Sequence, residues 1–198
     1  MAILPIYLFG TKVLKKTANP VESLDDSTVT LIYDMFETMH KANGLGLAAT
    51  QVGDLRRVIT IDISDVTEPN AEGETEDTLH PTSPDLPRTL ALINPEILSE
   101  DGKWFMEEGC LSLPHLRSEV ERAEKIRIRF YNAEFKQQEM IADGLLARVI
   151  LHELDHLNGI LFVDRVSKSK RSLLIPKLRK IRKGDVEVDY PVVTTEEE

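Results

Sequence analysis

Apolar residues at helical spacing predict a long helix near the start of the chain, in the stretch SLDDSTVTLIYDMFETMHKANG at residues 23–44. Val29, Ile32, Phe36 and Met39 recur every three or four positions, which places them on one face of a helix. The Asn-Gly pair that closes the stretch is typical of a helix end. Four polar residues can cap the free N–H groups at its start, namely Ser23, Asp25, Asp26 and Ser27.

Two further helices are predicted toward the C-terminus. The stretch DGLLARVILHELDHLNG at residues 143–159 has helical periodicity, a capping Asp143 and an Asn-Gly stop. Because this stretch is apolar on nearly all sides, we expect a central buried helix. A last, basic helix is expected from about residue 167 to residue 182, with Pro176 either kinking it or splitting it.

Alternating apolar runs predict strands before the buried helix. The segments are MAILPIYLFG, RRVITIDI, LALINPEIL, KWFMEEGCLSLP, EKIRIRFYNAEF and KQQEMIAD. A polar turn separates the last two, which favours an antiparallel pair. Strands that precede a buried helix, without parallel β-α-β units, indicate an α+β fold. In it, antiparallel β-sheets pack around the central helix, with an N-terminal helix and a C-terminal basic helix.

The length of 198 residues fits one domain, residues 1–198, with a single sizeable core. Residues 66–88 hold four of the ten prolines, many acids and almost no large apolar side chain. This composition predicts a mobile acidic loop inserted between strands rather than a domain boundary. Residues 184–198 are expected to form a flexible acidic tail.

Composition is that of an ordinary soluble globular protein, with 41% hydrophobic and 29% charged residues. The apolar N-terminus lacks the basic region and cleavage site of a signal peptide and is too short to cross a bilayer, so we expect a cytoplasmic protein. The net charge of -10 is uneven, because residues 165–183 hold nine basic residues and no acidic one. A solvated charged helix is the usual explanation of such a stretch, but the uneven charge also suggests an anionic partner.

The first candidate chemistry lies in ILHELDHLNG, at residues 150–159. His152 and His156 are four residues apart, so on a helix they project from one face and can share a metal ion. Glu153 stands beside them, where it can reach a water molecule at the metal. The alternative is a pair of satisfied core or surface histidines. Two histidines and two acids inside so apolar a helix would, however, be costly without a metal or partners.

A third ligand has to come from outside this helix. Metzincin proteases place a histidine three residues after the glycine, but Phe162 occupies that position here. A downstream glutamate would have to be Glu187, which falls in the acidic tail. Upstream, the lone cysteine Cys110 in EEGCLSLP is the one soft ligand, although a buried small hydrophobe is the usual role of a lone cysteine. Two histidines and one cysteine would leave a position open for water, as a hydrolytic metal requires.

Taken together, these residues resemble those of the peptide deformylase family. Three motifs match in the family's order: GLGLAATQ at residues 44–51, EGCLS at 108–112 and HELDHLNG at 152–159. The similarity covers most of residues 4–165. Three motifs in order, with the lone cysteine inside the second, are highly specific.

The resemblance implies that Cys110, His152 and His156 hold one divalent metal ion. In the family this ion is characteristically Fe(II), which zinc, nickel or cobalt can replace, and the donor set alone suits zinc and iron alike. Glu153 is implied as the general acid and base, which takes a proton from water and passes it to the leaving amine.

The resemblance also implies the substrate and the groups that bind it. The substrate is the N-formylmethionine end of a nascent polypeptide, and the products are formate and a free amine. The Gln51 side-chain amide and the Leu111 N–H stabilise the oxyanion, and Gly46 contributes backbone contacts. Leu151 replaces the glutamine that usually precedes the first metal histidine, so a hydrogen bond around the metal ligands is expected to be missing.

An apolar pocket of methionine size is expected beside the metal. We expect Arg117 to touch the substrate backbone and Arg122 to pair with Glu108. The pocket candidates are Leu45, Met106, Leu145 and Val149, although core packing explains each equally well.

Two other hypotheses remain open from the sequence. One is a zinc peptidase of the H-E-x-x-H type, which would cleave internal bonds of unformylated peptides. The other is a non-catalytic module that docks on the ribosome through the basic C-terminal helix. We expect catalysis and ribosome binding in one monomeric protein, with no membrane or DNA partner.

Overall fold

A five-stranded antiparallel sheet forms one side of the molecule in the computed structural model, which describes residues 1–66, 83 and 85–195. Its strand order is β2-β3-β4-β7-β8. Neighbouring strands are antiparallel throughout, including the predicted β7–β8 pair, so the α+β class is confirmed. The strands are β2 (Gly46–Ala48), β3 (Val58–Asp62), β4 (Thr89–Asp101), β7 (Lys125–Tyr131) and β8 (Gln137–Asp143).

A second, two-stranded antiparallel ribbon consists of β5 (Trp104–Cys110) and β6 (Leu113–Arg122). Strand β6 was not predicted. It alternates as a half-buried strand should, but its buried face carries Arg122 and the half-buried Ser118 among apolar residues, so the apolar signal in the sequence is weak.

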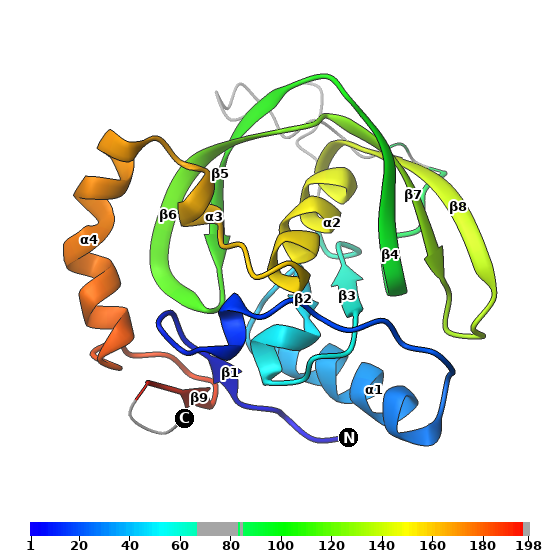
Figure 1. Ribbon diagram of the computed structural model, residues 1–198, viewed down its shortest axis with the longest axis horizontal. Helices are drawn as coiled ribbons and strands as arrows, with labels where there is room; N and C mark the ends of the chain where they lie inside the picture. Colours follow the sequence, from blue (N-terminus) through cyan, green and yellow to red (C-terminus); the bar gives the residue numbers. More distant parts are fainter. Residues whose placement is uncertain (67–82, 84, 196–198) are drawn as a thin grey trace.

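The helix α2 (Gly144–Leu157) lies between the five-stranded sheet and the ribbon (Figure 1). Nearly all of its side chains are buried, as its apolar surface predicts. Ile150 and Leu154 belong to a core cluster with residues of the facing sheet, including Ile59, Leu92 and Ile128. This packing fixes the position of every functional side chain that α2 carries.

The helix α1 (Asp26–Lys41) lies below the sheet and covers β2 and β3 (Figure 1). Of the four capping candidates, the side chain of Asp25 accepts a hydrogen bond from the Thr28 N–H at 2.8 Å. Asn43 has a positive φ of 54°, which ends the helix where the sequence predicts. Two short 3₁₀ turns complete this half, η1 (Val13–Lys15) and η2 (Ala49–Val52).

The C-terminal part holds the short helix α3 (Phe162–Arg165) and the basic helix α4 (Lys168–Arg182). Leu178 and Ile181 of α4 are buried in a cluster with residues of β6. Pro176 lies inside one continuous helix, so of the two expected effects, a kink or a split, the split does not occur.

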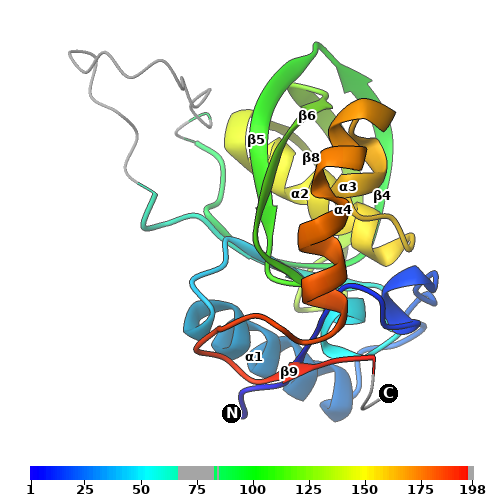
Figure 2. The same cartoon turned by 90° about the vertical axis from the view of Figure 1, so that its left-hand side faces the viewer.

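Residues 184–195, the described part of the chain beyond α4, differ from the flexible tail expected over residues 184–198. This segment runs back to β9 (Val192–Val193), which pairs in parallel with β1 (Ile6–Tyr7) (Figure 2). The Ile6 N–H donates to Pro191 O and the Leu8 N–H to Val193 O, both at 2.9 Å. The physical reason is the unpaired edge of β1, whose hydrogen-bonding groups the tail satisfies.

Most of the predicted acidic insertion at residues 66–88 lies outside the described residues. Within the part of the chain that the structure describes, no helix is long and apolar enough to cross a membrane.

We predict that Ile150→Ala lowers the free energy of unfolding by about 2–5 kcal/mol, because it leaves a cavity between α2 and the sheet. The matched control is Ile141→Ala on β8, where the side chain is 52% exposed and the expected change is within about 0.5 kcal/mol. Urea unfolding of both variants measures the difference. Equal losses would contradict the central role of α2 in the core.

Candidate metal centre

Three possible metal ligands converge at the inner end of a cavity. Cys110 Sγ lies 3.1 Å from His156 Nε2, and the Nε2 atoms of His156 and His152 are 3.3 Å apart. All three ligand atoms lie within 4.8 Å of one another. The structure therefore brings together the three residues that the sequence singled out as a ligand set.

Local structure explains how a strand and a helix meet here. His152 and His156 occupy successive turns on one side of α2. Cys110 ends β5 at a register shift, because Gly109 opposes Arg117 whereas Cys110 opposes Leu113. The irregularity turns the cysteine away from the regular ladder and toward the helix.

The donor positions fit a small divalent cation. For a tetrahedral ion with bonds of about 2.0 Å to nitrogen and about 2.3 Å to sulfur, neighbouring donors lie about 3.3–3.6 Å apart. The Cys110–His156 and His156–His152 separations of 3.1 and 3.3 Å are close to these values. Burial also lowers the pKa of His156, which favours the neutral imidazole that a metal requires.

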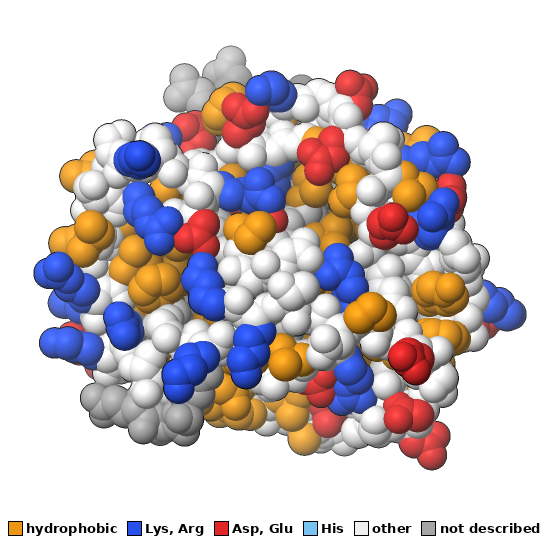
Figure 3. Space-filling view, viewed as in Figure 1, with side chains coloured by type: hydrophobic (Ala, Val, Ile, Leu, Met, Phe, Trp, Pro, Cys, Tyr) orange, Lys and Arg blue, Asp and Glu red, His pale blue; other side chains and the backbone are white. Residues whose placement is uncertain are grey.

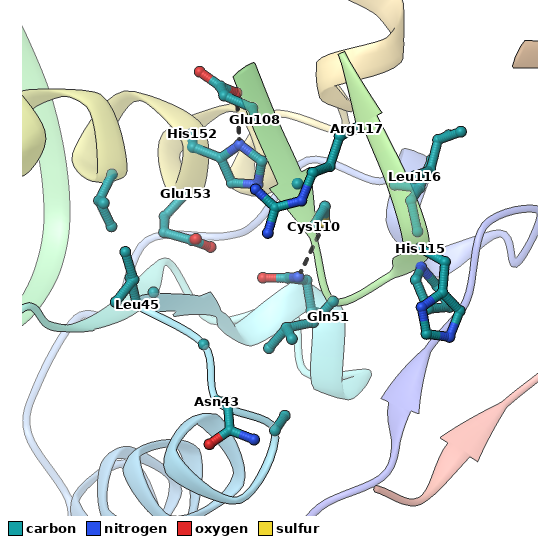
Figure 4. A pocket seen from close by; sticks show the side chains of 18 of the residues that line it. Asn43, Leu45, Gln51, Glu108, Cys110, His115, Leu116, Arg117, His152 and Glu153 are labelled. Carbon is teal, nitrogen blue, oxygen red and sulfur yellow. Dashed lines mark hydrogen bonds and ion pairs between the residues drawn. The ribbon is translucent and has the colours of Figure 1, made fainter. Parts of the chain in front are cut away.

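A buried carboxylate orients the first histidine. Glu108 Oε2 lies 2.9 Å from His152 Nδ1, which directs the lone pair of Nε2 toward the other two ligands (Figure 4). Arg122 donates to both carboxylate oxygens of Glu108 at 2.5 and 2.9 Å, so the expected Arg122–Glu108 pair is confirmed. Arg148 donates to Glu108 Oε1 at 2.6 Å, and its guanidinium lies 4.6 Å from the centre of the Trp104 ring.

The charges around Glu108 keep it ionised. Burial raises the pKa of this carboxyl, but hydrogen bonds from His152 and Arg122 and the charge of Arg122 outweigh burial and hold the pKa below its usual range. The same arginine donates to Asp155 Oδ2 at 2.8 Å, and Arg165 pairs with the same aspartate. The result is a buried ionic network directly behind the candidate ligands.

Leu151, which stands where the resemblance leads one to expect a glutamine, does not disturb this network. The Leu151 side chain is buried, and its carbonyl accepts a hydrogen bond from Arg122 at 3.3 Å. Leucine has no polar side-chain atom, so it cannot make the side-chain hydrogen bond that a glutamine could make.

Glu153 faces the cavity from α2 (Figure 4). Its Oε2 atom is buried and has no hydrogen-bond partner among the described residues. Burial raises its pKa to about 7, so the carboxyl can exchange a proton near neutral pH. Gly46 lies against it, because a Cβ atom there would sit 2.6 Å from Glu153 Oε1 and 2.8 Å from Val149 Cγ1.

Gln51 presents its amide nitrogen to the same centre. Its Oε1 accepts from the Ala48 N–H at 2.8 Å, which directs Nε2 toward Cys110 Sγ, at 3.6 Å (Figure 4). Nε2 is also 3.3 Å from Ser112 Oγ. Leu111 lies between Cys110 and Ser112 in the turn that joins β5 to β6 and lines the cavity.

A cavity of about 700 Å³ opens beside these groups. Its lining holds every candidate site residue except His156, which is buried behind it. Leu145 and Val149 are core residues as well as lining residues, and Met106 packs against the same core. The remaining substrate-binding candidates that line it are Leu45, Gly46 and Arg117.

Several lining residues were not singled out in the sequence. Arg148 is one, although a lone charge inside an apolar helix was a usable signal. Asp189 and Tyr190 of the C-terminal segment are two more, and they line the cavity together with Glu187, which the sequence named only as a poor candidate ligand. Their position depends on the β1–β9 pairing, which no local pattern reveals.

Comparisons with known proteins identify relatives of the whole chain. A family model described as polypeptide deformylase matches residues 3–172. The peptide deformylase of Salinibacter ruber is 43% identical over 198 residues, which cover 99% of this chain and 97% of that protein. A crystal structure of a peptide deformylase from Legionella pneumophila has a TM-score of 0.76 and 38% identity, and covers 93% of this chain and 98% of its own. The Ehrlichia chaffeensis enzyme in complex with actinonin has a TM-score of 0.75 and 33% identity, with 94% and 100% covered.

We predict that Glu108→Gln lowers the free energy of unfolding by about 3–5 kcal/mol, because it leaves two buried arginines without their shared counter-charge. It should also weaken metal binding about 10–100-fold, since His152 loses its charged partner. The control is Glu107→Gln, an exposed neighbour on the same strand. Urea unfolding and metal content after dialysis measure the two effects.

The same variant has a defined pH dependence. The lowered pKa of Glu108 stabilises the folded state above its usual value of 4.5, and this contribution is lost as the pH falls through the folded-state pKa. The stability difference between wild type and Glu108→Gln should be full at neutral pH and shrink progressively below about pH 4.5. A difference that is constant down to pH 3 would contradict the ionic role of Glu108.

Proposed function

The chain belongs to the polypeptide deformylase family, and on that premise we propose that it is a metal-dependent hydrolase that removes the formyl group from N-terminal N-formylmethionine. Its substrates are nascent polypeptides, and the products are formate and a free amine. The observation that carries this proposal is the convergence of Cys110, His152 and His156 beside a cavity that Glu153 also faces.

Cys110, His152 and His156 are the proposed ligands of one divalent ion, with Fe(II) as the ion in the cell and zinc, nickel or cobalt as substitutes. When bound, the ion supplies Lewis acidity, which polarises the formyl carbonyl and makes water acidic enough to lose a proton near neutral pH. Glu108 supports this assignment, because it fixes the ring orientation and tautomer of His152.

Glu153 is the proposed general base and acid. Its carboxylate takes a proton from the attacking water and later gives it to the amine that leaves when the C–N bond of the formamide breaks. A pKa of about 7 suits both transfers, because neither protonation state is strongly favoured near neutral pH.

Gln51 and Leu111 are the proposed oxyanion donors. Negative charge develops on the former formyl oxygen as water attacks, and donors held in place beforehand stabilise it most. The Gln51 amide is held by the Ala48 N–H at one end and directed toward Cys110 at the other. The Leu111 N–H belongs to the residue directly after Cys110.

The rest of the substrate is proposed to lie along the cavity. The absence of a side chain at Gly46 lets the peptide backbone approach Glu153 closely. Arg117, which lines the cavity from β6, is proposed to bind a substrate carbonyl (Figure 4). The proposed apolar pocket for the methionine side chain is lined by Leu45, Met106, Leu145 and Val149.

We also propose that the exposed basic side of α4 binds an anionic surface of the ribosome. Figure 3 shows that Lys and Arg side chains gather over this helix, at the left of the view. Lys177 and Lys180 are exposed on it. Residues 1–198 are proposed to act as one domain, and the monomeric state and cytoplasmic location stay predictions.

For the reaction, we predict that the ferrous-loaded protein releases formate from a short formyl-Met peptide. Glu153→Gln should lower kcat by about 10²–10⁴-fold with unchanged metal content, because the shape of the side chain remains and only the proton transfer is lost. Formate release and metal analysis on the same samples measure both. A loaded wild-type protein that released no formate would overturn the proposed function.

The zinc-peptidase alternative is tested in the same assay. An H-E-x-x-H peptidase with a different third ligand would tolerate Cys110→Ser and would cleave internal bonds of unformylated peptides. A deformylase that uses Cys110 as a ligand would lose metal and formate release together.

For the partner, we predict that the double variant Lys177→Glu/Lys180→Glu binds ribosomes more weakly, in a salt-dependent way, but turns over short formyl peptides at the wild-type rate. Point changes are preferable to removal of the C-terminus, because the chain beyond α4 reaches the catalytic cavity. Lys125→Glu/Lys136→Glu, on β7 and in the turn after it, is a control with the same charge change. Co-sedimentation at two salt concentrations measures binding, and equal binding by both variants would contradict the role of α4.

A further inference from the structure

The C-terminal segment beyond α4 forms one wall of the catalytic cavity, where Glu187, Asp189 and Tyr190 contribute to the lining. Two anchors hold it in place. The β1–β9 pairing fixes its far end, and His115 Nε2 lies 2.8 Å from Glu187 O on its near side. A segment that lies some thirty residues beyond the last of the three motifs thus lines the catalytic cavity.

Tyr190 contacts the turn that holds Cys110 and Leu111. Its hydroxyl donates a hydrogen bond to the Leu111 carbonyl at 2.9 Å. Its ring is half-buried and packs against the core cluster that includes Leu47 and Ala49. Burial raises the pKa of this tyrosine to about 12, so the hydroxyl remains a protonated donor at any pH at which the enzyme would be assayed.

The turn that contains Leu111 is restrained from three sides. The Phe9 N–H donates to Ser112 O at 2.9 Å, and Gln51 Nε2 lies 3.3 Å from Ser112 Oγ. Tyr190 donates to the carbonyl of Leu111. The N–H and the carbonyl of Leu111 are joined through one Cα atom, so a restraint on the carbonyl limits the rotations that would turn the N–H away from its target.

We propose that Tyr190 is a positioning residue for the deformylation reaction, which holds the turn at residues 110–112 so that the Leu111 N–H stays aimed at the developing oxyanion. This inference rests on the proposed function and adds to it a residue from the C-terminal segment. The β1–β9 pairing is then part of the catalytic architecture, because it delivers Tyr190 to the turn.

Tyr190→Phe tests the proposal, because it keeps the ring and removes only the hydroxyl. With the ferrous-loaded enzyme and a short formyl-Met peptide, kcat should fall about threefold to tenfold, the size expected for one lost hydrogen bond, with KM and metal content unchanged. Tyr33→Phe, on the exposed surface of α1, is the matched control and should keep the wild-type kcat.

A second readout separates positioning from general support of the cavity wall. A peptide hydroxamate offers an oxygen to the oxyanion donors, whereas a peptide thiol binds the metal through sulfur and offers none. Tyr190→Phe should weaken hydroxamate binding by a factor similar to the loss in kcat and leave thiol binding unchanged. Equal weakening of both ligands, or an unchanged kcat in an active enzyme, would overturn the positioning role. A wild-type enzyme without formate release would overturn the proposed function as well.

Discussion

The buried carboxylate of Glu108 is the interaction on which the rest of the site depends. It comes from β5, and its partners come from β6 through Arg122 and from α2 through Arg148 and His152. A charge in this position is stable only while all of these elements are docked, because an unpaired buried carboxylate is very unfavourable. The network therefore couples the docking of the ribbon against α2 to the orientation of the candidate ligands.

The irregular end of the ribbon brings Cys110 close to the two histidines of α2. A regular ladder would carry Cys110 past the helix, but the register shift after Gly109 turns the chain toward α2. The turn that results is held by groups from both ends of the chain, namely the backbone of Phe9 and the hydroxyl of Tyr190. Segments that share no motif and lie at opposite ends of the sequence thus determine the geometry of one short turn.

The sequence predicts the parts of this structure that local patterns encode and fails where partners are distant. The helices α1, α2 and α4 and most strands were predicted, α1 and α2 from their apolar periodicity. The motifs around Cys110 and His152 single out residues that the structure brings together. Strand β6 was missed because Arg122 and Ser118 interrupt the apolar pattern of its buried face. The pairing of the tail with β1 was missed because β9 has only two residues and therefore almost no recognisable pattern in the sequence. The tail is held by its pairing with β1, which is distant in the sequence.

Two buried polar groups of the site reduce the stability of the folded state, and one of them favours reactivity. Glu153 Oε2 and His156 Nδ1 are buried without hydrogen-bond partners among the described residues, and each such group is expected to lower the stability of the folded state by about 1–3 kcal/mol. Full pairing of Glu153 would hold its carboxylate ionised and remove its ability to return a proton. The apolar packing of α2 offsets this penalty, since nearly the whole helix surface is buried. The helix is therefore buried on all sides for a functional reason as well as a structural one: only a rigid, well-packed scaffold can keep an unsatisfied carboxyl at the site where a proton must move.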